Sequence, residues 1–290
     1  MATTDTPTCT VCLIVKNEAP YLVEWVAYYR VLGFDEIIVY DNNSTDGTGP
    51  LLQALAREGL ITYRQWLQGR TQSPQITAYV EMLARGIDSD WVLFVDTDEF
   101  LVLHHHETVG EFLATLHGRE DVAAIGVNWR IFGDSGLAAP DGRPSIVRFT
   151  QGAEDDFISN NHIKCFSRVS RIEHCDNMHA CQVRGAFVHA SGAPLTMGEW
   201  GLSLAVELDV AQVNHFCIRT PVEYAEKKRR GRGGFAEIAP EKHNYDAEIY
   251  DFHNRNEVRD VSAQRHLGRV LAEMERLETI VAKAGVALSA

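Results

Sequence analysis

The 290-residue sequence lacks any apolar run close to the roughly 20 residues that a membrane-spanning helix requires. Residues 1–10 lack the basic start and the apolar stretch of a secretory signal peptide. The chain also lacks internal repeats and low-complexity segments. We therefore expect a cytoplasmic protein with no transmembrane segment, and we leave peripheral contact with the inner membrane open.

Positive charge is scarce as well. The 27 Lys and Arg residues stand against 40 Asp and Glu residues, which gives a formal net charge of −13. A protein that binds a phosphate backbone needs a basic face, so we expect no nucleic-acid partner. The composition, 45% hydrophobic and 23% charged, excludes a disordered chain. The length suits one large α/β domain, or a smaller domain with an appendage.

Cysteine is too rare for a disulfide-rich scaffold, since the chain has only 6. Cys9 and Cys12 have C-x-x-C spacing, but they lie in a run that is typical of a buried strand. A zinc site needs a second close pair of ligands, and His174–Cys181 offers one only at irregular spacing. We expect buried or half-buried free thiols, with structural zinc as the alternative.

Strand and helix signals alternate through the first hundred residues. Apolar strands are expected at 11–15, 36–40, 60–66 and 91–95, with helices ending near Gly33 and Gly59 and a third at 75–85. Further strands are expected at 122–129, 145–150, 163–169, 186–189 and 207–216, and helices at 221–234 and around 267–281. The pattern predicts an α/β fold, with a mostly parallel sheet, helices on both faces and C-terminal helices. We expect one domain over residues 1–220, with a nucleotide-binding half at about 9–103 and an acceptor half at about 120–220. Residues 221–290 would be a helical extension packed on it.

The most informative motif follows the strand at 91–95. Asp96 and Asp98, on either side of Thr97, offer two carboxylates at a strand's carboxyl end, where ligands bind in parallel sheets. Such a pair can hold Mg²⁺ or Mn²⁺ together with substrate phosphate oxygens. An isolated D-x-D is also typical of a solvated acidic turn, but its place after a fully apolar strand favours the metal site.

Two other strand tips add to this rim. Asp41 ends the strand at 36–40, and Glu18 follows the strand at 11–15. Residues 44–48 are typical of a turn that caps the next helix, but such a turn does not account for an aspartate at position 41, at the tip of the strand. Carboxylates from three strand tips would suit a nucleotide, because they accept hydrogen bonds from base N–H groups and ribose hydroxyls.

Several segments in consistent order resemble a known family. The chain is similar to glycosyltransferase family 2-like proteins of GT-A fold, in the branch that shares motifs with family 92 transferases. The matching segments are 14–25, 38–48, 91–100, 129–136, the strand with Lys164, 214–216 and 224–231. The resemblance covers roughly residues 9 to 233.

The resemblance implies site roles. It makes Glu18 and Asp41 ribose- and uracil-side contacts of a nucleotide-sugar donor, most simply a UDP-sugar. It makes Asp96 and Asp98 the metal-binding pair, with His215 as a late third ligand. The expected donor-binding set is Lys16, Glu18, Asp41, Asn43, Gln75, Asp96 and Thr97. Residues 227–232 are expected to clamp the diphosphate, although a basic helix end also suits the helix dipole. Trp129 is expected to face the acceptor, with a core position as the alternative.

The implied reaction is metal-dependent, inverting transfer of a sugar to a hydroxyl of a glycan or other acceptor. Inversion needs a carboxylate base, for which Asp134 and Asp156 are the alternatives. The sequence departs from the family's pattern at two places. Asp134 stands where the family commonly has a small polar residue, and Ser167–Val169 stand where the family usually has Arg-Pro. A phosphatase with Asp96 as nucleophile and a non-catalytic nucleotide- or carbohydrate-binding module are the competing functions.

Overall fold

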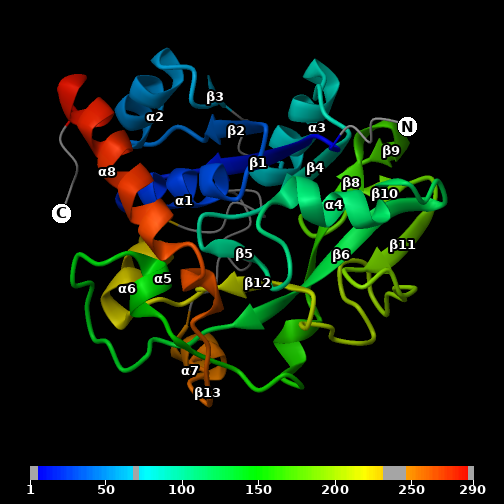
Figure 1. Ribbon diagram of the computed structural model, residues 1–290. Helices are drawn as coiled ribbons and strands as arrows, with labels where there is room; N and C mark the ends of the chain where they lie inside the picture. The colour runs from blue at the N-terminus through cyan, green and yellow to red at the C-terminus, as the bar shows by residue number, and fades with distance from the viewer. Residues whose placement is uncertain (1–5, 68–71, 231–245, 287–290) are drawn as a thin grey trace.

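A nine-stranded sheet forms the centre of the molecule (Figure 1). The computed structural model describes residues 6–67, 72–230 and 246–286. The strand order is β3-β2-β1-β4-β8-β6-β12-β5, and β11 pairs with β6 outside this path. No helix in these ranges is both long and apolar enough to span a membrane.

The first four strands are parallel, as the alternating pattern predicts. They are β1 (Cys9–Val15), β2 (Glu36–Asp41), β3 (Thr62–Gln65) and β4 (Trp91–Phe94). The intervening helices are α1 (Ala19–Val31), α2 (Thr48–Arg57) and α3 (Pro74–Arg85). The carboxyl ends of β1, β2 and β4 therefore lie at one edge of the sheet.

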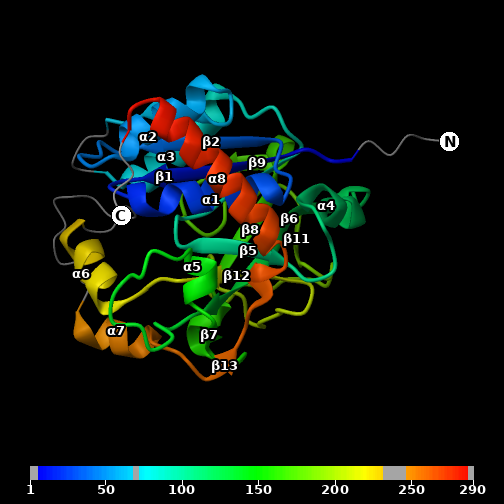
Figure 2. The ribbon, with the colours of Figure 1, turned by 60° about the vertical axis from the view of Figure 1, so that its left-hand side comes forward.

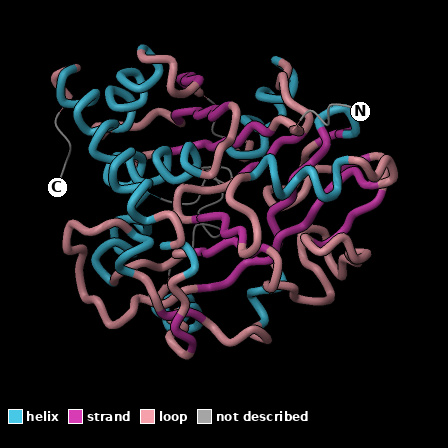
Figure 3. The backbone as a smooth tube through the Cα atoms, in the orientation of Figure 1, coloured by secondary structure: helices cyan, strands magenta, loops and turns pink. Residues whose placement is uncertain are grey.

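The other half of the sheet is mixed. β8 (Ile163–Arg168) runs antiparallel between β4 and the ten-residue β6 (Val122–Ile131). The other side of β6 pairs first with β11 (Ala186–His189) and then with β12 (Ala211–His215), both parallel to it. β12 also pairs antiparallel with β5 (Glu99–Leu103), which begins directly after the D-x-D turn. This brings His215 into register with Glu99. Many connections in this half are loops (Figure 3).

The remaining elements are short or lie at the rim. They are α4 (Val109–His117), α5 (Ser145–Arg148), α6 (Pro221–Arg230), α7 (Ala247–His253), α8 (Leu267–Lys283), the paired strands β7 (Gln151–Gly152) and β13 (Val258–Arg259), and the paired strands β9 (Ile172–His174) and β10 (Gln182–Val183). Single turns of 3₁₀-helix at Ile158–Asn161, Val169–Arg171 and Ser262–Gln264 complete the described part.

The two faces of the sheet have separate cores. Val11 and Leu13 of β1 join one core with side chains of α1, α2, α4 and α8, whereas Cys12 joins another with α3. α8 lies along α1 and α2 (Figure 2), with Val270, Leu277 and Val281 buried. The apolar side chains of α8 thus pack against helices of the N-terminal half of the chain.

The expected strand at 145–150 is wrong. Ser145–Arg148 forms the short helix α5, because the buried Glu24 carboxylate accepts hydrogen bonds from the backbone N–H groups of Ser145 (2.8 Å) and Ile146 (2.9 Å). A carboxylate at a helix start satisfies donors that have no partner within the helix. The capping group lies on α1, more than a hundred residues earlier, so the local sequence did not reveal it.

The expectation of free thiols is partly wrong. Cys175 and Cys181 form a disulfide across a seven-residue loop. The other cysteines are free, and Cys9, Cys12 and Cys165 are buried. Cys9 and Cys12 belong to opposite cores of the sheet, so their side chains cannot bind one zinc ion.

Candidate active site

A cavity of about 680 Å³ lies at the carboxyl ends of β1 and β4. Its wall combines residues that follow these strands, the start of α3, the ends of β6 and β12, and side chains of α6 and α7. With the turn after β2 and the stretches around 159–162 and 178–179, ten separate segments converge there, including two helices beyond residue 220. A pocket of this size, at this end of a parallel sheet, is the expected place for a ligand.

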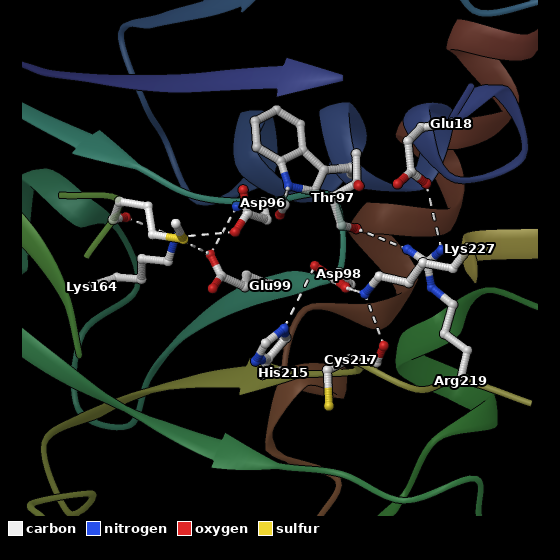
Figure 4. Close-up of polar contacts among 12 residues, drawn as sticks. Glu18, Asp96, Thr97, Asp98, Glu99, Lys164, His215, Cys217, Arg219 and Lys227 are labelled. Carbon is white, nitrogen blue, oxygen red and sulfur yellow. Dashed lines mark hydrogen bonds and ion pairs between the residues drawn. The ribbon is translucent and has the colours of Figure 1, made fainter. Parts of the chain in front are cut away.

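Buried polar side chains hold the carboxylate of Asp96 in place (Figure 4). Its carboxylate accepts hydrogen bonds from Gln75 Nε2 at 2.7 Å and from Lys164 Nζ at 3.2 Å. Lys164 is fully buried and also forms an ion pair with Glu99 at 3.1 Å. Burial alone would lower the pKa of Lys164, but the negative charges of Asp96 and Glu99 have the larger effect and raise the pKa above its usual value. Lys164 therefore balances the charge of Asp96 inside the protein.

Glu99 completes this network below the D-x-D turn. Its Oε2 accepts a hydrogen bond from the backbone N–H of Asp96 at 2.8 Å. Burial raises the pKa of Glu99 to about 7, even though the cation of Lys164 acts in the opposite direction. The turn that presents Asp96 and Asp98 is thus fixed by both a side chain and a strand, β5.

Asp98 lies on the side of the turn toward His215 and Lys227 (Figure 4), and it lines the cavity as Asp96 does. Its carboxylate forms an ion pair with Lys227 of α6, and its Oδ1 lies 3.7 Å from His215 Nε2. Burial raises the pKa of Asp98, but Lys227 and His215 together lower it well below its usual value. Asp98 is therefore an ionised carboxylate that lies against two basic side chains.

The residues around Asp98 fit a divalent cation. In the described part of the chain, no three His, Cys, Asp or Glu side chains form a preassembled metal cage. Mg²⁺ and Mn²⁺ do not need one, since they bind one or two carboxylates and take further ligands from substrate phosphates. Asp98 and His215 supply the oxygen and nitrogen donors that Mn²⁺ accepts, and His215 Nδ1 is buried without a hydrogen-bond partner. A cation at this point would replace Lys227 as the partner of Asp98.

Arginines surround the third acidic group of the cavity. Glu18 is paired with Arg230 of α6 and lies 3.5 Å from Arg219. Arg219 adopts a positive φ of 52° and its guanidinium stacks on Tyr21, 3.3 Å from the ring centroid. Backbone strain of this kind persists where surrounding contacts enforce it. Lys227, Arg219 and Arg230 thus gather on one side of the D-x-D turn. Of the expected basic clamp 227–232, Lys228 and Arg229 are exposed, and 231–232 lie outside the described residues.

The structure brings together most of the expected donor-binding set. Lys16, Glu18, Gln75, Asp96 and Thr97 all line the cavity. The remaining two expected residues do not.

Asp41 is the last residue of β2, and Asn43 lies in the turn that follows. Asp41 Oδ1 accepts a hydrogen bond from the N–H of Ser44 at 2.9 Å, and Asn43 is exposed. Asn42, between them, lines the cavity. Asp41 thus stabilises the turn after β2, a role that the sequence suggested only for residues 44–48.

Neither expected base lines the cavity. Asp134 accepts hydrogen bonds from Tyr250 Oη at 2.8 Å and from Asn254 Nδ2 at 3.0 Å, so it ties its loop to the region of α7. Asp156 is exposed, and the neighbouring Asp155 pairs with Arg130 at 2.6 Å. Asp134 is therefore held by α7 and the segment after it, and Asp156 lies on the surface outside the cavity lining.

Four histidine side chains form what we call the imidazole wall of the cavity. His162, His179, His215 and His253 line the cavity together with Trp129. Trp129 is 9% exposed and stacks on His162 with ring centroids 4.5 Å apart. Sequence reasoning missed His162 and His253, and it considered His179 only as a zinc ligand, since these residues share no spacing that a pattern could show.

Comparisons with known proteins agree on one family. The model of glycosyltransferase family 92 matches residues 8–195. A family 92 protein of Oryza sativa subsp. japonica is 28% identical over 158 residues, which is 48% of this chain and 26% of that protein. A family 92 protein of Arabidopsis thaliana is 30% identical over 125 residues, which is 43% of this chain and 21% of that protein. The aligned part therefore spans about a quarter of these curated relatives.

Solved structures show weaker likeness. S. aureus TarS 1-349 aligns with a TM-score of 0.39 at 16% identity, over 56% of this chain and 47% of that one. Glucosyl-3-phosphoglycerate synthase of Mycobacterium tuberculosis, solved with Mg²⁺ and uridine-diphosphate, aligns with a TM-score of 0.33 at 21% identity, over 57% of each chain.

Proposed function

The chain belongs to glycosyltransferase family 92, and on this premise we propose that it transfers a sugar from a nucleotide-sugar donor, a UDP-sugar, to an acceptor hydroxyl of a glycan or similar molecule. The observation that carries the proposal is the D-x-D turn at the end of β4. It places Asp98 in the cavity wall beside His215, Lys227 and Arg219. A carboxylate next to several cations suits a metal-bound diphosphate.

The basic side chains would bind the diphosphate. Lys227, Arg219 and Arg230 now neutralise Asp98 and Glu18, and a diphosphate with its cation offers them equivalent partners. Asp98 and His215 would hold Mn²⁺ or Mg²⁺, which stabilises the negative charge on the departing diphosphate. Gln75 and Lys16 line the same side of the cavity and would contact the nucleoside.

Sugar transfer would proceed in one displacement. An oxygen of the acceptor hydroxyl bonds to the anomeric carbon, the bond from that carbon to the diphosphate oxygen breaks, and its electron pair leaves with UDP. The anomeric carbon passes through an oxocarbenium-like state. Attack from the face opposite the diphosphate inverts the configuration, and the hydroxyl proton must pass to a base.

The surroundings of Asp96 disfavour the phosphatase alternative. Both carboxylate oxygens of Asp96 already accept a hydrogen bond, one from Gln75 and one from Lys164, which lowers the nucleophilicity of the carboxylate. A non-catalytic binding module would share the ligand but not the reaction. Product detection separates these outcomes, because the phosphatase releases phosphate from simple esters and the module releases nothing.

The test is a thermal-shift screen of UDP and UDP-sugars, with Mn²⁺ or with excess EDTA. A ligand that binds only the native state at about 100 times its Kd stabilises the protein by ~2.7 kcal/mol. We expect stabilisation by UDP with Mn²⁺ that Asp98→Asn abolishes and Asp88→Asn, an exposed carboxylate outside the cavity, retains. Equal stabilisation in EDTA would contradict the metal-bridged site.

A further inference from the structure

Three of the four histidines of the imidazole wall share one hydrogen-bond polarity. Nδ1 of His162 lies 3.0 Å from the carbonyl oxygen of Ser159, and Nδ1 of His179 lies 3.2 Å from that of Ile163. His253 Nδ1 lies 2.9 Å from the carbonyl oxygen of Ile249. A carbonyl accepts only, so each Nδ1 carries the hydrogen.

In a neutral imidazole, the lone pair then resides on Nε2. Nε2 of His162 and of His179 thus offers a hydrogen-bond acceptor rather than a donor at the cavity wall, whereas Nε2 of His253 lies 3.3 Å from the Ser159 Oγ. Hydroxyl groups are the matching donors, and an aromatic face such as Trp129 suits the apolar side of a sugar ring. This wall therefore has the chemistry of a subsite for a polyhydroxyl acceptor.

The carboxylates of the cavity are committed elsewhere. Among the lining residues that the structure describes, the acidic side chains are Glu18, Asp96 and Asp98. Each is paired with a cation, since Glu18 contacts Arg230, Asp96 contacts Lys164 and Asp98 contacts Lys227. All three belong to strand tips of the donor side.

His162 is the best placed of the three imidazoles. It stacks on Trp129 at an interplanar angle of 12°, and the same indole contacts His215, whose ring centroid is 4.1 Å away, beside Asp98. His253 instead lies beyond Ser159, with Nε2 3.3 Å from the serine Oγ. One indole thus connects His162 to the residues that would hold the departing diphosphate.

The basicity of His162 suits a proton acceptor. Burial lowers its pKa to about 4, close to the ordinary value of an aspartate carboxyl. Burial and nearby Lys164 also hold the pKa of His179 well below its usual value. His162 is therefore neutral at physiological pH, the state in which an imidazole can accept a proton.

We propose that His162, rather than a carboxylate, is the general base for the acceptor hydroxyl; the proposal rests on the proposed function. The hydroxyl O–H bond breaks and its proton passes to Nε2, which gives an imidazolium. The freed electron pair forms the bond to the anomeric carbon, while the electron pair of the bond to the diphosphate leaves with UDP. The proton then returns to solvent.

The experiment measures UDP release from UDP-glucose, UDP-galactose and UDP-GlcNAc with Mn²⁺, using water and methyl glycosides as acceptors. We expect His162→Ala to lower kcat by ~100-fold or more, the usual contribution of a general base, while UDP affinity is unchanged. With His162→Ala, added imidazole should restore UDP release. Azide is a nucleophile that needs no deprotonation, so it should also restore UDP release and yield a glycosyl azide. His162→Gln keeps the stacking volume on Trp129 and checks that the loss is not one of folding. His174→Ala, an exposed imidazole outside the cavity, stays at the wild-type rate.

Two results would overturn the assignment. One is UDP release by His162→Ala within a few-fold of wild type. The other is a dead variant that binds UDP normally and that neither imidazole nor azide rescues. A wild-type protein that releases UDP from none of the donors would instead contradict the proposed function, so the two failures are distinguishable.

Discussion

Lys227 and a divalent cation would compete for the carboxylate of Asp98. Replacing Lys227 should therefore change the affinity for Mn²⁺ and the affinity for UDP in opposite directions. Lys227→Met keeps the length of the side chain and removes its charge from Asp98. Hydrogen bonds to charged groups contribute ~1.5–3 kcal/mol, so the apparent affinity for Mn²⁺ without nucleotide should rise by ~10- to 150-fold. Because Lys227 would also contact the diphosphate, affinity for UDP in saturating Mn²⁺ should fall.

The same variant should make stability depend on metal. Removing one partner of a buried ion pair costs ~3–5 kcal/mol, because it leaves the other charge uncompensated. At ~2–4 °C per kcal/mol for a chain of comparable size, Tm without metal should fall by on the order of 10 °C, and Mn²⁺ should recover most of it.

Isothermal titration with Mn²⁺ and thermal melts with and without EDTA measure both effects. Lys228→Met is the matched control, since the neighbouring lysine on α6 is exposed and does not line the cavity. Unchanged or weaker binding of Mn²⁺ by Lys227→Met, together with a Tm that ignores the metal, would refute the competition.

Three further predictions concern other parts of the fold. Cys175→Ser should lower the free energy of unfolding by ~2–3 kcal/mol. A thiol titration of the unreduced, denatured wild-type protein should count four thiols, not six. Asp134→Asn should lower stability by ~1–3 kcal/mol, because Tyr250 and Asn254 lose a charged acceptor, while kcat changes little; a ~100-fold loss of kcat at normal Tm would return Asp134 to the role of base. Burial raises the pKa of Glu223, but Arg148 and Thr220 lower it to about 2, so its stabilisation is present above pH 4.5 and is lost between 4.5 and 2. Glu223→Gln should flatten the urea stability across that window, and an unchanged pH profile would contradict the ion pair with Arg148.

The parts of the structure that sequence revealed are local. β1 to β4 are apolar runs between turn residues, and the D-x-D turn follows β4 directly, so both the sheet edge and the position of Asp96 and Asp98 could be predicted. The resemblance added His215, which β12 does bring beside Asp98. Each of these features depends on neighbours within a few residues or on one familiar segment.

What sequence did not reveal depends on distant partners. α5 forms because Glu24 caps it from α1, and the disulfide depends on the β9–β10 pairing, which a six-residue spacing alone does not imply. Asp134 looked available as a base because its partner Tyr250 is more than a hundred residues away. The imidazole wall is assembled from the ends of separate segments, and no periodicity in the chain connects them.

The most direct test of the account is detection of the transferred sugar itself. The protein is incubated with a UDP-sugar, a mixture of methyl glycosides and Mn²⁺, and the products are resolved by mass spectrometry and NMR, with Asp98→Asn as the matched variant. The account predicts a new glycoside of inverted anomeric configuration together with stoichiometric UDP, both absent with Asp98→Asn or EDTA. An equal yield from Asp98→Asn, or a product of retained configuration, would contradict it.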